Sequence, residues 1–223
     1  MKKILLVTHH DLSDPGIISS LLHSNYLTCN INYKNLPLLK LGDINEYSAI
    51  IIFGGKMSAN SKSIYIKNEY KFLSNAIKLK KIIIGICLGA QIIAKFYGSI
   101  IQKSPNKEVE IGYRNTKKID NSIINDRIKF LQFHNEGISI NSNMELLSKG
   151  NLFNVDAFKI KNKEVYGFQF HPEVTSKMIK HWYGNLKSID KGTDKLSKIL
   201  KDHKTYHKEN YFWLNKILNK IIK

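Results

Sequence analysis

Two runs of consecutive apolar residues constrain the fold of this chain most strongly. They lie in "YSAIIIFGG" at 47–55 and "KKIIIGIC" at 80–87. Each run is shorter than an ordinary helix and has no polar face, as is typical of a strand buried on both sides. Strands of that kind belong to parallel sheets covered by helices on both faces. We therefore expect an α/β protein with an open, mostly parallel sheet.

Helix-like segments alternate with these strands through the first half of the sequence. "KILLVTHH" at 3–10 and "TCNINYK" at 28–34 are further strand candidates, and a helical stretch lies around 17–22. Helical spacing covers 64–80, and "LGAQIIAKFYG" directly follows the second apolar run, with Gly98 as its expected C-terminal cap. This alternation predicts βαβ units.

The second half is expected to add short strands and a helical tail to this sheet. Residues 105–162 contain short strand-like pieces, and "EVYGFQFHPEV" at 164–174 predicts a strand that ends at its proline. Helices are expected at 176–186 and from 193 onward. The second of these should bury one stripe of apolar residues, formed by Tyr211, Leu214, Leu218 and Ile221. Since neither an internal repeat nor a linker is visible, we expect one domain over 1–223, with 175–223 as its helical C-terminal extension.

The formal charge of +17 invites a nucleic-acid hypothesis, which the composition does not favour. Only two of the 35 basic residues are arginine, the residue that most often makes bidentate contacts with bases. The lysines are spread along the chain among many Ile and Asn residues, which share A/T-rich codons with lysine. Specific nucleic-acid binding is therefore not expected.

The first residues do not form a signal peptide or a membrane span, because polar residues interrupt the apolar run after six positions. We expect a cytoplasmic protein. In a reducing compartment its two cysteines, Cys29 and Cys87, should be free thiols.

Cys87 lies in the sequence Gly-Ile-Cys-Leu-Gly, between a predicted strand and a predicted helix. This is the cysteine form of the nucleophile elbow, in which a tight turn exposes the nucleophile and flanking glycines relieve crowding. The N-terminus of the following helix favours the thiolate, and the N–H of Leu88 can bind an oxyanion. A purely structural cysteine is the alternative, but the strand-turn-helix context favours the nucleophile. Cys29 has no such setting.

A base and its orienting group are expected in "GFQFHPEV". His171 and Glu173 are two residues apart in an extended segment, so their side chains should leave the same face. A carboxylate there can fix the tautomer of the imidazole and stabilise its cation. Together with Cys87 they predict a Cys-His-Glu triad. The paired Gly54 and Gly55 end another buried strand, where a backbone N–H can complete an oxyanion hole.

Four other histidines have weaker claims to function. His9 and His10 follow the first strand near the ligand-binding edge of the sheet, but solvated or capping roles are the more ordinary expectation. His203 and His207 share a helical spacing without a third ligand. We predict no metal site.

The motifs "GICLGAQ" and "GFQFHPEV" resemble those of the class I, triad-type glutamine amidotransferases. "FGGKMSAN", "EIGYR", "LQFHNEG" and "NVDAFKI" follow the order of the GMP synthase-like branch, and the resemblance extends to about residue 182. It implies a flavodoxin-like sheet. It also implies roles for individual residues: Cys87 as nucleophile, His171 as base, Glu173 as its orienter, Gly55 and Leu88 as oxyanion donors, Gln91 as a glutamine contact, and His134 with Glu136 in the loop facing the α-amino end of the substrate.

Four positions depart from the usual pattern of the family. Lys56 stands in place of a proline, Glu136 in place of an aspartate, Asp156 in place of a glutamine and Tyr113 in place of a tryptophan. None belongs to the triad. They leave the reaction type unchanged and the identity of the γ-glutamyl substrate open.

The resemblance implies a glutaminase that releases glutamate and ammonia through a γ-glutamyl thioester, without a metal or organic cofactor. The sequence contains neither a P-loop nor an SGG-x-DS-type nucleotide loop, so a synthetase that uses the ammonia, such as a GMP synthase-like enzyme, would be a separate ATP-dependent polypeptide. The long tail is more typical of free-standing members. Two alternatives remain open: a γ-glutamyl peptidase or hydrolase with the same triad, and a non-catalytic binding or regulatory protein on this scaffold.

Overall fold

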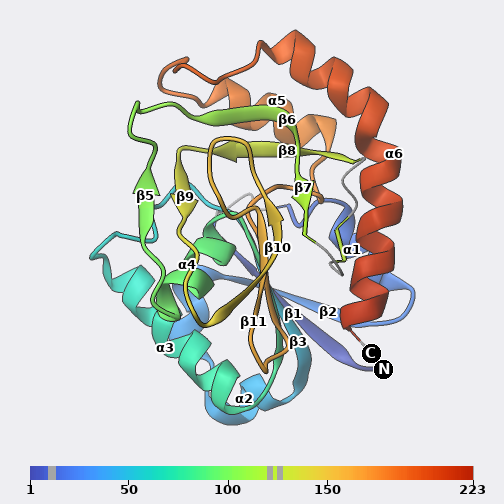
Figure 1. Cartoon of the computed structure of the whole chain (residues 1–223). Coiled ribbons are helices and arrows are strands. Elements are labelled where there is room, and N and C mark those ends of the chain that lie inside the picture. Colours follow the sequence, from blue (N-terminus) through green and yellow to red (C-terminus); the bar gives the residue numbers. More distant parts are fainter. Residues whose placement is uncertain (10–13, 120–122, 125–127, 223) are drawn as a thin grey trace.

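The computed structural model describes residues 1–9, 14–119, 123–124 and 128–222, and its central feature is an eight-stranded sheet (Figure 1). Five strands are parallel, and in spatial order they are β2 (Leu27–Asn32), β1 (Lys3–Thr8), β3 (Tyr47–Ile52), β4 (Ile82–Ile86) and β12 (Val165–Phe168). Three antiparallel strands continue the sheet, namely β11 (Ala157–Ile160), β10 (Met144–Lys149) and β7 (Lys117–Lys118). The expected open, mostly parallel sheet is confirmed.

Both faces of the sheet are buried, as the unbroken apolar runs predict. Alternate residues of β1 point to opposite sides: Leu5 and Val7 pack in one core cluster, and Ile4 and Leu6 in the other. On the first side lie α3 (Ile64–Lys78) and α4 (Leu88–Phe96), with the short helices η1 (Tyr33–Leu38) and α2 (Leu41–Asn45). On the second side lie α1 (Ile17–His23) and α6 (Leu196–Ile221).

Two small antiparallel ladders lie beyond the carboxyl ends of the central strands. One pairs β5 (Ile101–Lys103) with β9 (Glu136–Ile138), and the other pairs β6 (Glu110–Asn115) with β8 (Lys129–His134). A third apolar cluster joins β6 and β8 to α5 (Ser176–Gly184) and the first part of α6. These are the extra strands and helices expected in the second half of the sequence.

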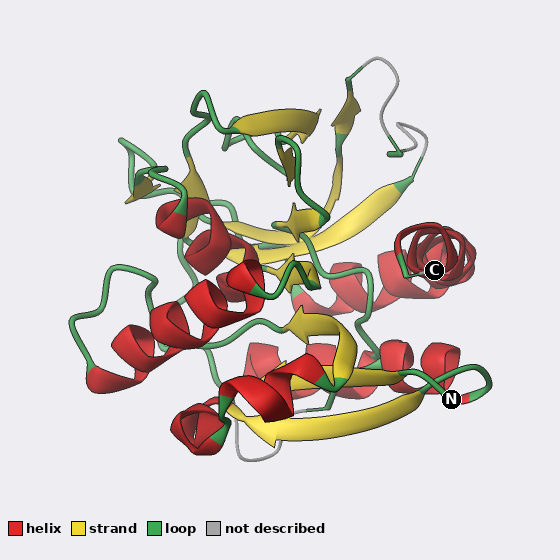
Figure 2. Ribbon diagram, turned by 90° about the horizontal axis from the view of Figure 1, so that it is seen from below, coloured by secondary structure: helices red, strands yellow, loops and turns green. Residues whose placement is uncertain are grey.

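Helix α6 runs along one side of the sheet and is seen nearly end-on in Figure 2. Its buried stripe differs by one position from the expected one, because Tyr211 is 41% exposed. The neighbouring Asn210 is buried instead, and its Nδ2 donates to the carbonyl of Lys129 at 2.9 Å. That hydrogen bond fixes the rotation of the helix and turns Tyr211 outward.

Two further expectations concern how elements end. Gly98 has φ 95°, and its N–H donates to the carbonyl of Lys95 at 3.0 Å, so it ends α4 as expected. Strand β12 ends at Phe168, four residues before Pro172, so the predicted strand was too long. None of the described helices combines the length and apolar character needed to cross a bilayer.

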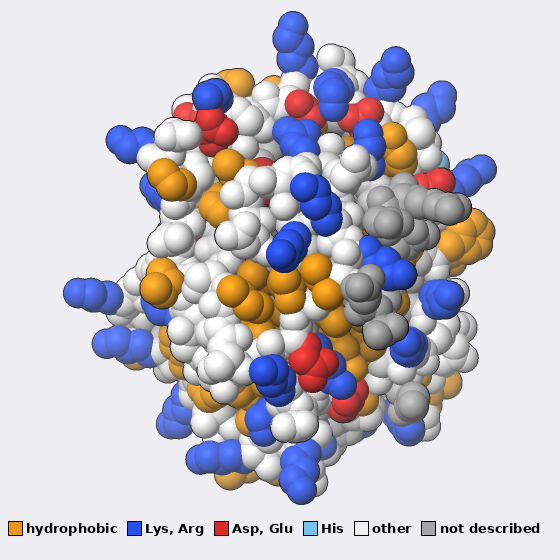
Figure 3. Space-filling view, viewed as in Figure 1, with side chains coloured by type: hydrophobic (Ala, Val, Ile, Leu, Met, Phe, Trp, Pro, Cys, Tyr) orange, Lys and Arg blue, Asp and Glu red, His pale blue; other side chains and the backbone are white. Residues whose placement is uncertain are grey.

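Basic side chains are scattered on the face of the molecule shown in Figure 3. Lys and Arg project from its outline and from its centre, with acidic and apolar groups between them. On this face the charge does not form a continuous stripe that would follow a nucleic-acid backbone.

Candidate active site

Cys87 occupies the turn between β4 and α4, in a backbone conformation that few L residues adopt. Its φ is 50° and its ψ is −106°. A Cβ atom at Gly85 would come within 2.6 Å of the backbone nitrogen of Ala90, and one at Gly89 within 2.2 Å of the carbonyl oxygen of Ile52. Both glycines are therefore required for the turn to close, and the predicted elbow is present.

His171 is placed next to this turn by backbone contacts outside the main sheet. Its N–H donates to the carbonyl of Leu131 in β8 at 2.8 Å, which forms an isolated bridge. Glu173 is fixed from the other side, because its carbonyl accepts the N–H of Ile17 at the start of α1. Residues 172–173 form a turn rather than the extended segment expected from the sequence. The two side chains nevertheless meet: Nδ1 of His171 donates to Oε1 of Glu173 at 2.8 Å.

The electrostatics of this pair favour a charged imidazole. Burial alone would lower the pKa of His171, but the Glu173 carboxylate and a hydrogen bond with the Cys87 sulfur outweigh it and raise the pKa to about 10. His171 is thus held as a cation between two acidic groups. This arrangement can stabilise a thiolate and later donate a proton to a leaving group.

Two residues that the sequence did not single out hold the His171 ring in place. A Cβ atom at Gly54 would lie 2.9 Å from Cε1 of His171 and 3.4 Å from Cβ of Cys87, so glycine leaves room for both groups. Trp182 of α5 packs against the imidazole with a centroid distance of 4.7 Å. The glycine pair was a signal for Gly54, whereas the contact with Trp182 depends on how α5 returns to the sheet.

Gly55 and Leu88 lie next to each other, as their predicted common role requires. A Cβ atom at Gly55 would come within 2.9 Å of Cδ2 of Leu88 and within 2.6 Å of Cβ of His9. His9 is not the solvated or capping residue expected from the sequence. Its side chain is fully buried and its Nε2 lies 2.9 Å from Oε1 of Glu69. His10 lies outside the described residues.

The three residues expected to contact glutamine are joined by hydrogen bonds. Nε2 of Gln91 donates to the carbonyl of Glu136 at 2.9 Å and to Oε1 of Gln169 at 3.2 Å. Nδ1 of His134 donates to the same Glu136 carbonyl at 3.0 Å, and the Glu136 carboxylate accepts from Oγ of Ser58 at 2.7 Å. These contacts fix the turn between β8 and β9.

The remaining cysteine and histidines are placed away from Cys87 in the sheet or on α6. Cys29 is a half-buried residue of β2, as expected. His203 accepts or donates a hydrogen bond at 2.7 Å with the hydroxyl of Tyr113, and its ring centroid lies 5.6 Å from that of His207. Among the described residues, no group of three His, Cys, Asp or Glu side chains is placed to hold a metal ion.

Comparison with known proteins assigns a family to this geometry. The family model described as "Glutamine amidotransferase class-I" matches residues 16–189, a range that includes Cys87, His171 and Glu173. The chain belongs to this family. It is thus a class I glutamine amidotransferase family enzyme, and its sheet with the long C-terminal helix is the fold of that family.

Individual relatives add detail. The glutamine-hydrolyzing subunit of GMP synthase from Methanococcus aeolicus is 32% identical over 145 residues, which cover 64% of this chain and 73% of the relative. A solved glutamine amidotransferase from Thermotoga maritima has a TM-score of 0.87 at 22% identity and covers 100% of this chain and 98% of its own. A structure assigned as a GMP synthase subunit from Thermoplasma acidophilum has a TM-score of 0.65 at 22% identity, covering 78% of this chain and 85% of its own.

Proposed function

We propose that this amidotransferase hydrolyses the side-chain amide of glutamine through a triad of Cys87, His171 and Glu173. The observation that carries the proposal is the position of His171, which is hydrogen-bonded to Glu173 on one side and to the Cys87 sulfur on the other. Cys87 is only 7% exposed, so the sulfur is shielded from bulk water while it lies beside its base.

In this proposal the reaction is an acyl transfer in two steps. The Cys87 thiolate attacks the side-chain carbonyl carbon, and the oxyanion is bound by the N–H groups of Gly55 and Leu88. His171 donates its proton to the amide nitrogen, the C–N bond breaks and ammonia leaves a γ-glutamyl thioester. His171 then accepts a proton from water, which attacks the thioester and releases glutamate.

The β8–β9 turn is the proposed site for the α-amino end of glutamine. Its backbone is fixed by Gln91 and His134, and the carboxylate of Glu136 is half-exposed near Ser58. A carboxylate there suits a cationic amino group. Gln91 acts in this proposal by holding the Glu136 carbonyl as well as by lining the glutamine site.

A separate ATP-dependent synthetase is the proposed consumer of the ammonia. The relative from Methanococcus aeolicus is a glutamine-hydrolyzing subunit of GMP synthase, which supports a divided arrangement. The full coverage by the Thermotoga maritima structure, against 78% by the Thermoplasma acidophilum one, favours a free-standing member. We likewise infer that residues 175–223 extend the same domain.

The test is an ammonia-release assay with glutamine and a set of γ-glutamyl peptides, repeated with Cys87→Ala. Turnover of glutamine by the wild type, and its loss in the variant, is the expected result. Preference for the peptides would instead indicate a γ-glutamyl peptidase. If no substrate is turned over, even with candidate synthetases added, the enzyme is not a stand-alone or synthetase-dependent glutaminase. A glutamine-like electrophile should label Cys87 and leave Cys29 unmodified.

A further inference from the structure

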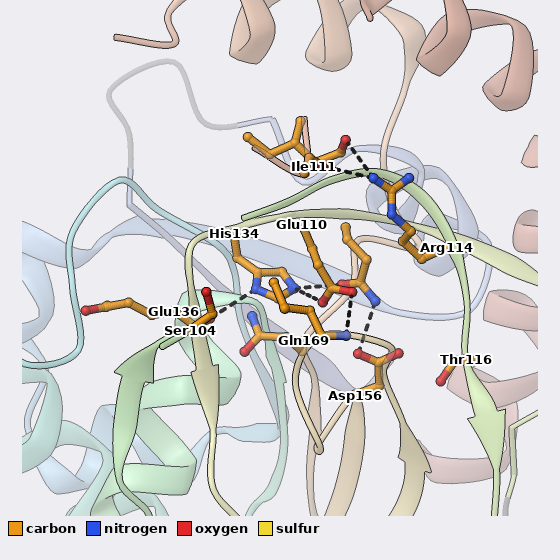
Figure 4. Close-up of polar contacts among 12 residues, drawn as sticks. Ser104, Glu110, Ile111, Arg114, Thr116, His134, Glu136, Asp156 and Gln169 are labelled. Atoms are coloured by element: carbon orange, nitrogen blue, oxygen red, sulfur yellow. Dashed lines mark hydrogen bonds and ion pairs between the residues drawn. The ribbon is translucent and has the colours of Figure 1, made fainter. Parts of the chain in front are cut away.

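A chain of four buried polar groups leads from Asp156 to the proposed glutamine site. Oδ1 of Asp156 lies 3.1 Å from Nε2 of Gln132, and Oε1 of the same amide lies 2.9 Å from Nε2 of His134. Nδ1 of His134 lies 3.0 Å from the carbonyl oxygen of Glu136. Figure 4 shows Asp156 and His134 directed toward the same interior space, with Glu110 beside them.

The hydrogen bonds of this chain depend on one another. The Glu136 carbonyl can only accept, so Nδ1 of His134 must carry a proton to bond with it. A neutral His134 then has a lone pair on Nε2, which requires the NH₂ end of the Gln132 amide. A half-turn about the last side-chain bond of Gln132 exchanges the two ends of its amide. The amide oxygen would then face Asp156, which can bond with it only as a protonated acid.

The alternative is a cationic His134 with an ionised Asp156, and the surrounding charges oppose it. Burial lowers the pKa of His134 to about 3, and repulsion from His171 adds to this effect against the hydrogen bond of the Glu136 carbonyl. Glu110 is the nearest acid to the ring, with Oε2 at 3.7 Å from Nε2. Burial raises the pKa of that carboxyl despite the N–H of Leu152 and the charge of Arg114, so it offers the ring little negative charge.

Asp156 itself is held close to the point of ionisation. Burial, and then repulsion from Glu110, raise its pKa to about 7, against weaker opposing effects of Thr116 and Gln132. Its backbone N–H donates to Ser148 and its carbonyl accepts the N–H of Gln169, so the main chain is fixed in either state. Within the described residues its Oδ2 has no hydrogen-bond partner.

We propose that Asp156 is a positioning residue whose proton sets the tautomer of His134 and thereby the hydrogen bond that holds the Glu136 carbonyl. When Asp156 loses its proton, its carboxylate takes the NH₂ end of Gln132. The amide oxygen then faces Nε2 of His134, which must become the protonated nitrogen. Nδ1 is left with a lone pair facing the Glu136 carbonyl, and that hydrogen bond is lost. The proton balance is complete, because Asp156 gives one proton to solvent and His134 exchanges one between its nitrogens.

The catalytic consequence rests on the function proposed above. The Glu136 carbonyl also accepts from Gln91, so losing the His134 bond loosens the turn that faces the substrate without touching Cys87 or His171. The KM for glutamine should therefore rise by roughly tenfold between pH 6 and pH 8.5, as one lost hydrogen bond implies. The kcat should change much less, because the reacting groups stay in place.

The first measurement does not require activity. In ¹⁵N-labelled protein, the ring nitrogens of His134 distinguish the two tautomers by their chemical shifts. At pH 6 Nδ1 should carry the proton, and at pH 8.5 Nε2 should carry it. In Asp156→Asn the side-chain NH₂ donates to Gln132 at every pH, so Nδ1 should stay protonated throughout. The same tautomer at both pH values in the wild type, or an imidazolium at pH 6, would overturn the proposal even if the protein is an active glutaminase.

The second measurement is the pH profile of KM and kcat. Asp156→Asn should abolish the rise in KM for glutamine, whereas Asp202→Asn, at a surface ion pair with Lys198, should keep it. A KM rise that persists in Asp156→Asn would contradict the proposal. If the wild type turns over no glutamine at all, the function proposed above fails, and the ring-nitrogen shifts still decide whether Asp156 controls the tautomer.

Discussion

Nδ1 of His171 donates to Oε1 of Glu173 at 2.8 Å, and both side chains are buried. Replacing Glu173 with glutamine keeps an acceptor but removes the charge that raises the pKa of His171. The imidazolium that protonates the leaving nitrogen is then lost at a lower pH. We expect kcat to fall by about 10²- to 10⁴-fold and the alkaline limb of the kcat–pH profile to move toward neutrality. Glu46→Gln, in an exposed ion pair, is the control, and an unmoved limb in Glu173→Gln would contradict the expectation.

The conformation of Cys87 predicts a difference between two inactive variants. Both Cys87→Ala and Cys87→Gly remove the sulfur, but only glycine relieves the strain of φ 50°. Cys87→Gly should therefore be more stable than Cys87→Ala by roughly 1 kcal/mol. Urea unfolding of the two variants measures this difference. Equal midpoints and equal slopes would show that the turn is not strained.

Gly54 gives a test of how closely the triad is packed. In Gly54→Ala the new methyl group would start 2.9 Å from Cε1 of His171, so the ring must move away from Cys87. A displacement of this size should lower kcat by about 10- to 100-fold with little change in stability. The matched control is Gly42→Ala in α2, where a Cβ atom meets nothing within 4 Å. Steady-state kinetics and thermal melts of both variants separate a local effect from a general one.

The buried pair of His9 and Glu69 should contribute much more to stability than an exposed one. Removing His9 leaves the Glu69 carboxylate buried without its partner, so His9→Ala should lose about 3–5 kcal/mol of unfolding free energy. Glu46→Ala breaks the exposed pair with Lys3 and should lose far less, because water replaces the interaction. Chemical denaturation of the two variants compares the losses. Losses of similar size would mean that the His9 site is hydrated.

The sequence predicted best those features that depend on neighbouring residues. The strand before Cys87 and the helix after it follow from local apolar patterns, and the glycines of the elbow follow from the tightness of one turn. His171 and Glu173 are two residues apart, so their pairing was visible even though the backbone between them forms a turn.

Features built from distant segments were not visible in the same way. His9 and Glu69 are sixty positions apart, and nothing near His9 indicates a buried partner. Asp156, Gln132 and His134 come from two strands and a loop, so their connection requires the register of the sheet. The stripe on α6 was misplaced by one residue because a single amide, that of Asn210, sets the rotation of the helix.

Helix α6 also decides when the protein can finish folding. Trp213 packs on Phe130 and on Phe168 and Phe170, which lead directly to His171. A ribosome that has made only the first 195 residues therefore holds a chain whose aromatic face is still open to water. That face is a natural target for chaperones until α6 has left the exit tunnel. The base of the proposed triad is thus among the last parts of the molecule to be fixed during synthesis.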